Sequence, residues 1–145
     1  MSAENFDWKE FQKQTGIQDA ELEIIKSDPR RAKVAERTLG SPEFQKKYLI
    51  IEVVKSDGCA AGLKVGDRLY FKGCSVLDLE KSGPWCNLAF GNFDMLATLC
   101  HERWVAGLDL DDLHFNHIPC VDTGVRGGGW GQVVMKGYVK DESEL

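Results

Sequence analysis

The sequence predicts an α+β fold: a small, mainly antiparallel sheet with one packed main helix, preceded by an N-terminal helical arm. Three observations indicate this class. Residues 1–46 carry nine acids and eight bases but no cysteine and only two of the fifteen glycines, a composition typical of solvated helices. From Lys47 onward, β-branched and aromatic residues are interspersed with turn glycines, which favours strands. A single apolar recurrence of helical type then runs through residues 84–102.

The first half of the arm contains signals for two helices. Phe6, Trp8 and Phe11 share part of one helix face, and the turn at Gly16 should end that helix. Asp19 is a candidate N-cap for the second helix.

The second half of the arm repeats one start signal twice. Asp28-Pro29 reads as an N-cap followed by the first helical residue of a helix that reaches Leu39, where Gly40 stops it. Ser41-Pro42 gives the same signal again. These helices have too few apolar positions for a core of their own, so the arm should pack on the rest of the chain or on a partner.

The second unit, residues 47–139, is expected to form the α+β domain, followed by a loose tail at residues 140–145. Its predicted elements are strands at 48–54 and 68–71, the main helix at 84–102 and a closing strand at 132–139. The chain has 145 residues, of which 38 are Leu, Ile, Val or Phe, enough for one domain with one core.

Charge and cysteine usage narrow the function classes. The net charge of -5 disfavours nucleic acid and anionic membranes as partners. No apolar run is long enough for a spanning helix and the N-terminus does not resemble a signal peptide, so a soluble cytoplasmic protein is expected. Five cysteines without a C-x-x-C pair indicate reduced thiols and argue against a disulfide framework, a zinc ribbon or a thioredoxin-like site.

The segment from His114 to Asp122 is the richest in chemistry, because two imidazoles, a thiol and a carboxylate lie within nine residues. One chain segment could supply two ligands by turning at Pro119, and other segments would supply the rest. The sharpest hypothesis is therefore a zinc or ferrous-iron site built from Cys59, Cys86, His117 and Cys120. The simpler interpretation, which we favour, is that these cysteines are buried as small hydrophobic residues.

Two further features have both a chemical and a structural interpretation. Cys86 follows Pro84 at the expected start of the main helix, where a helix dipole would stabilise a thiolate, or else it packs as a thiol beside Trp85. The glycine-rich stretch 124–131 could bind an anion through its amides and Arg126, or else form a turn with Trp130 packed on the sheet. His114, Asp122, Arg126 and Trp130 are the additional pocket candidates.

Several of these motifs in order resemble a family of small, largely uncharacterised bacterial and archaeal proteins, many of them from anaerobes. The resemblance rests on residues 48–54, Cys59-x-x-Gly62-x-x-x-Gly66-Asp67, Pro84-Trp85-Cys86 and Cys120-Val-Asp122. The resemblance covers about residues 47–139 and implies a repeat-like domain with a strand and a Cys-Pro-Trp at a helix start. This chain departs from it at Gly83, where the family has cysteine. The family brings no established reaction with it.

Three functions fit these observations. The first, which we prefer, is a small accessory or regulatory subunit that docks on a larger metabolic enzyme through its arm and exposed aromatic residues, with or without a Cys/His metal site. The second is a stand-alone enzyme acting on a small polar or aromatic compound in a Cys/His/Asp pocket. The third is a metal or redox sensor. The expected partner is a larger protein subunit or further copies of the chain.

Overall fold

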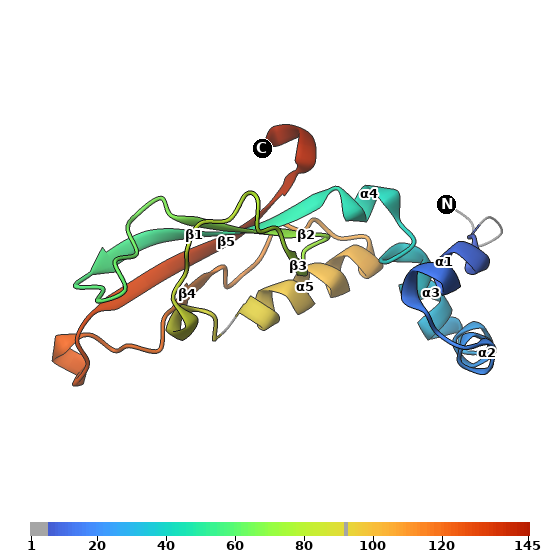
Figure 1. Cartoon of the computed structure of the whole chain (residues 1–145), viewed down its shortest axis with the longest axis horizontal. Helices are drawn as coiled ribbons and strands as arrows, with labels where there is room; N and C mark the ends of the chain where they lie inside the picture. The colour runs from blue at the N-terminus through green and yellow to red at the C-terminus, as the bar shows by residue number, and fades with distance from the viewer. Residues whose placement is uncertain (1–5, 92) are drawn as a thin grey trace.

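The computed structural model describes residues 6–91 and 93–145 and confirms the α+β class (Figure 1). Three helices form an arm at one end of an elongated molecule, and a sheet with one long helix beneath it forms the rest. The helices are α1 (Trp8–Thr15), α2 (Asp19–Ser27), α3 (Pro29–Arg37), α4 (Pro42–Gln45) and α5 (Phe93–Ala106). The strands are β1 (Lys47–Asp57), β2 (Arg68–Lys72), β3 (Val76–Leu77), β4 (His117–Pro119) and β5 (Gln132–Asp141).

The predicted start signals of the arm are confirmed, with one shift. The Asp28 carboxylate accepts the amides of Arg30 and Arg31 with Pro29 at the first helical position, and the Ser41 hydroxyl accepts the amide of Phe44. Helix α2 begins one residue earlier than expected, because Gln18 serves as its N-cap through a reciprocal capping box with Glu21.

The arm has a small apolar cluster of its own, which corrects the expectation that it has none. Phe11, Leu22 and Ala35 are buried together, with Phe6 and Trp8 packed against them. The rings of Phe6 and Trp8 meet edge to face with centroids 4.6 Å apart, and each lies 5.7 Å from the ring of Phe11. Three aromatic rings therefore supply the apolar area that the short helices lack.

The five strands form one antiparallel sheet in the order β3-β2-β1-β5-β4. The central pair is β1 and β5, the two longest strands, and both edge strands are short. Short edges leave little unpaired backbone for pairing with other chains. One face of the sheet carries the core side chains and is covered by α5 (Figure 1).

Helix α5 begins at Phe93, so the predicted helix at 84–102 is placed too early. The expected entry signal serves β2 instead, because the Ser82 hydroxyl accepts the Tyr70 amide and the Gly83 amide donates to the Arg68 carbonyl. Between residues 84 and 91, only the short turn Asn87–Ala89 is helical. Within the residues described, no helix is both long and apolar enough to cross a membrane.

A close contact sets the distance between α5 and the sheet. Gly137 of β5 faces Leu96 of α5, and a Cβ on this glycine would lie only 2.5 Å from the Leu96 Cδ1 atom. Leu96 and Cys100 are fully buried and lie on the core side of α5 with Phe93 and, one turn further on, Trp104. The row of core-facing residues on α5 therefore ends with Trp104, at the end of the helix nearest the arm.

The C-terminal tail is more ordered than expected. Lys140 and Asp141 belong to β5 and pair with Tyr48 and Lys47 of β1. The following turn, Glu142–Glu144, is closed by a capping box in which Glu144 accepts the amide of Asp141 at 2.8 Å. Strand pairing and this turn replace the loose tail that the polar sequence suggested.

Candidate functional site

The structure does not bring the four predicted metal ligands together. Cys59, Cys86 and Cys120 are half-buried and pack against the core, as the simpler interpretation expected. His117 lies opposite Lys136 in the register of β4 and β5, whereas Ile118 pairs with Met135 on the core side. His117 is therefore exposed on the open face of the sheet, away from the three thiols.

Other contacts occupy the thiol of Cys120. Its sulfur accepts the Val133 amide at 3.3 Å and lies 3.7 Å from the Asp122 carbonyl oxygen. Across residues 6–91 and 93–145, no three histidine, cysteine or carboxylate side chains gather in a group that could hold a metal ion. The Cys120 thiol thus bonds to the backbone at the start of β5.

Cys86 does not stand at the start of the main helix, which corrects the basis of the thiolate hypothesis. It precedes the three-residue turn Asn87–Ala89 in an extended conformation, and its carbonyl accepts the Ala89 amide at 2.9 Å. The dipole of α5 begins seven residues later at Phe93. Cys86 therefore does not lie at the helix N-terminus that would have stabilised a thiolate.

The glycine-rich stretch is an ordered loop built around Asp122. The Asp122 carboxylate accepts the amides of Gly124, Trp130 and Gly131 at 3.0 to 3.1 Å. These backbone hydrogen bonds, the one from Gly131 first, lower the pKa of Asp122 below its usual value. Because the carboxylate occupies the amides, they face an internal anion rather than a ligand.

The remaining pocket candidates, Trp130, Arg126 and His114, are all exposed. The Trp130 side chain is 84% exposed, so the expectation that it packs on the sheet is wrong. Arg126 is exposed in the turn Val125–Gly127. His114 is also exposed, with its ring against that of Phe115 at 4.3 Å. None of these three side chains lines either of the two hollows described below.

Sequence reasoning missed a pair of thiols in the core. Cys74 and Cys100 are both completely buried, and the hydrogen bond between them, together with burial, raises the pKa of the Cys74 thiol. Cys74 has a φ of 58° in the turn after β2, a conformation that L-residues seldom adopt. The sequence offers no signal for this pair, because its members are 26 positions apart on a turn and a helix.

The open face of the sheet carries a hydrogen-bonded group of three side chains, Glu52, Arg68 and Tyr138. The Glu52 carboxylate accepts the Tyr138 hydroxyl at 2.7 Å and the Arg68 Nε at 2.9 Å. The bond from Tyr138 first, and then that from Arg68, lowers the pKa of Glu52. Burial and the bond to Glu52 raise the pKa of Tyr138 to about 12. Glu52, Arg68 and Tyr138 therefore satisfy one another on this face and form no open site among themselves.

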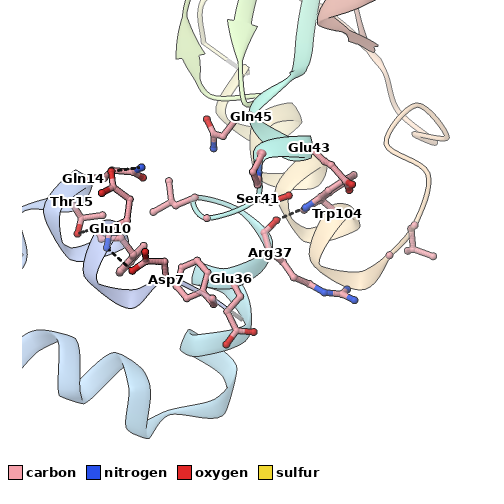
Figure 2. Close-up of a pocket in the computed structure, with 17 residues that line it drawn as sticks. Asp7, Glu10, Gln14, Thr15, Glu36, Arg37, Ser41, Glu43, Gln45 and Trp104 are labelled. Carbon is pink, nitrogen blue, oxygen red and sulfur yellow. Dashed lines mark hydrogen bonds between the residues drawn. The ribbon is translucent and has the colours of Figure 1, made fainter. Parts of the chain in front are cut away.

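A cleft of about 1190 Å³ lies where the arm meets the domain, and it is the larger of the two hollows described here (Figure 2). Two hydrogen bonds cross this junction: the Trp104 indole donates to the Arg37 carbonyl, and the Arg37 guanidinium donates to the Val105 carbonyl. The Trp104 ring also stacks on Phe44 with centroids 5.3 Å apart. Trp104 thus joins the core of the domain to the end of α3.

The lining of this junction cleft combines apolar and acidic side chains. The apolar members come from both sides of the junction: Phe6, Phe11, Leu39, Pro42, Trp104 and Leu108. Leu39 and Leu108 are 52% and 53% exposed, so they offer unused apolar surface. Figure 2 shows Asp7, Glu10 and Glu36 on the arm side and Glu43 on the domain side. Four carboxylates thus face one basic lining residue, Arg37.

Comparisons of the chain with protein-family models, with curated proteins and with solved structures find no match. The resemblance to the small bacterial and archaeal family therefore stays a prediction.

Proposed function

We propose that this protein is a small accessory or regulatory subunit that docks on a larger protein through the cleft between its arm and its α+β domain. The observation that carries this proposal is the exposed apolar surface inside that cleft, contributed by Leu39 before α4 and Leu108 after α5. Exposed apolar side chains grouped in a concave site are typical of surfaces that bind another molecule.

The size of the cleft favours a protein segment over a small molecule. Sites for small ligands measure roughly 300–1,000 Å³ and enclose most of the ligand. The junction cleft has about 1190 Å³, and many of its lining residues, among them Glu10, Gln14 and Glu43, are exposed. An open hollow of this size suits a partner segment that fills it from one side.

The construction of the arm also supports docking. Among the residues that the structure describes, the apolar cluster of the arm has three buried members, Phe11, Leu22 and Ala35. Few contacts join α3 to α5 beyond the two hydrogen bonds of Arg37. Packing of a partner in the cleft would bury apolar surface on both the arm and the domain and so stabilise their relative positions.

Site-specific photo-crosslinking in the native host tests this proposal. A benzophenone amino acid replaces Leu108 in the cleft, and the matched control carries it at Leu79, which is exposed beyond β3. We expect a discrete adduct with one larger protein from position 108 and not from position 79.

Two results contradict the proposal. Equal adducts from both positions, or none from position 108, would show that the cleft is not a preferred docking site. An adduct only between copies of the 16.2 kDa chain would indicate self-association and overturn the role as a subunit of a larger protein.

A further inference from the structure

We infer that the segment received by the junction cleft is a basic amphipathic helix, whose apolar side packs on Trp104 and Leu108 and whose cations face the surrounding carboxylates. This inference rests on the proposed function and specifies the chemistry of the partner. It follows from the distribution of charge at this end of the molecule, from the apolar floor and from the elements that line the cleft.

A second hollow, of about 210 Å³, lies on the other side of Trp104 and Leu108. Both residues line both hollows, so they form a ridge between them. The second hollow adds four carboxylates to those of the junction cleft: Asp109, Asp111, Asp141 and Glu144. It adds two cations, Lys47 and Lys140. A helix lying across the ridge would have acidic groups on both sides.

The excess negative charge of the chain is located at this ridge. Eight carboxylates and three cations line the two hollows, an excess that equals the net charge of -5 of the whole chain. The rest of the sequence therefore carries as many basic as acidic side chains. A surface with such a concentrated field attracts a partner of opposite charge and orients it during the encounter.

Several of these carboxylates are available to a partner. Lys47 pairs with Asp141 at 2.9 Å and Lys140 pairs with Glu144 at 3.1 Å, which neutralises one side of the second hollow. Glu36 and Glu43 form no ion pair with any residue that the structure describes. These two side chains are the best placed to accept cations from an incoming helix.

The lining elements indicate that the occupant is helical. Residues from α1, α3, α4 and α5 line the junction cleft, and no residue of a strand does. The cleft therefore offers no sheet edge to which an extended peptide could add a strand. An amphipathic helix presents apolar side chains at i, i+3, i+4 and i+7 on one face, and these fit between neighbouring helices.

The test uses three synthetic peptides of about 14 residues, roughly 21 Å long as helices. All three carry leucine on one helical face, and the other face carries lysine, glutamine or glutamate. Fluorescence anisotropy measures the dissociation constant of each peptide with the full chain. We expect the lysine peptide to bind roughly tenfold more tightly than the glutamine peptide, with a difference that shrinks in salt, and the glutamate peptide to bind more weakly still.

Matched variants locate the binding. Glu36→Gln with Glu43→Gln removes two charges at the cleft, and Glu80→Gln with Asp94→Asn removes two exposed charges elsewhere. We expect the first pair to weaken lysine-peptide binding roughly tenfold and the second pair to leave it unchanged, since each exposed ion pair contributes a factor of about two to five. Equal losses in both variants would overturn the inference, because they would indicate attraction to net charge alone.

The peptide panel separates failure of this inference from failure of the proposed function. Binding of the glutamine or glutamate peptide at the cleft as tightly as the lysine peptide would retain docking but overturn the basic partner. Failure of all three peptides to bind would contradict docking itself. A dimer in sedimentation that dissociates on replacement of Arg30 and Arg31 would identify a second copy as the occupant, with its basic α3 in the cleft, and would also overturn the inference.

Discussion

The contact between the Phe6 ring and Gly40 gives the sharpest prediction about the stability of the arm. An ideal Cβ at Gly40 would lie 1.8 Å from the Cε2 atom of Phe6. Carbon atoms in contact lie about 3.5–4.0 Å apart, so Gly40→Ala must displace the ring by about 2 Å. The ring would then lose its packing against Trp8 and Phe11, the neighbours it meets at 4.6 and 5.7 Å.

The magnitude follows from these two aromatic pairs. Each pair contributes about 0.5–1.5 kcal/mol beyond its buried area, so loss of both lowers the free energy of local opening of the arm by about 2 kcal/mol. That free energy corresponds to an increase of about 30-fold in the equilibrium constant for opening. The sheet lies outside this cluster and should keep its stability.

Amide hydrogen exchange measured by NMR tests this prediction. In Gly40→Ala, the amides of Phe11 and Leu22, which donate within the first turns of α1 and α2, should exchange about 30-fold faster, whereas amides of β1 should not change. Gly83→Ala is the matched control, because Gly83 has open space around its Cβ position and no positive φ. Equal exchange rates of the arm amides in the two variants would refute the claim that packing of Phe6 over Gly40 stabilises the arm.

Three further predictions concern the domain. Asp122→Asn should speed amide exchange at Trp130 and Gly131 without affecting the sheet. Acidification below the usual carboxyl pKa of 3.8 should do the same in the wild type, because the pKa of Asp122 is lowered and its stabilisation is lost as the pH falls through the pKa of the folded state. Unchanged exchange at these two amides would contradict the prediction. Leu96→Ala should lower the free energy of unfolding in urea by about 3 kcal/mol, since Leu96 is fully buried, and a loss below 1 kcal/mol, roughly the transfer term of one methylene, would refute its place in the core. Burial lowers the pKa of His101 below 6.5, so the unfolded chain binds a proton first as the pH falls, and the free energy of unfolding should rise with pH up to about 6.5. His101→Gln should flatten this rise in denaturation curves measured at several pH values. A pH dependence that persists in the variant would assign the rise to another group.

The local signals in the sequence predicted the arm and the strands well. Capping at Asp28-Pro29 and Ser41-Pro42 depends on residues that are adjacent in the chain, so the sequence shows it directly. The strand at 48–54 was likewise evident from its run of β-branched residues, and the structure extends it to Lys47–Asp57. Pairing with β5 explains the extension, because a long partner strand continues the ladder in both directions.

The candidate site was much less predictable, because it depends on contacts between distant parts of the chain. Trp104 and Arg37 meet across 67 positions, and the segment between them gave no sign of that contact. The metal hypothesis illustrates the same limit. His117 begins β4 and is exposed on the open face of the sheet, whereas Cys120 follows directly after β4 and packs against the core. The chain spacing of the two residues does not reveal this, because the side on which each lies depends on the pairing of β4 with β5.

The central claim, that the junction cleft is the docking site, is tested most directly by the indole NMR signals of the chain. The sequence contains four tryptophans, Trp8, Trp85, Trp104 and Trp130, and each gives one indole N–H signal. On titration with the lysine peptide, the signal of Trp104 should shift while that of the exposed Trp130 stays in place. A shift of Trp130 without a shift of Trp104 would contradict the claim and move the docking site to the loop around Asp122.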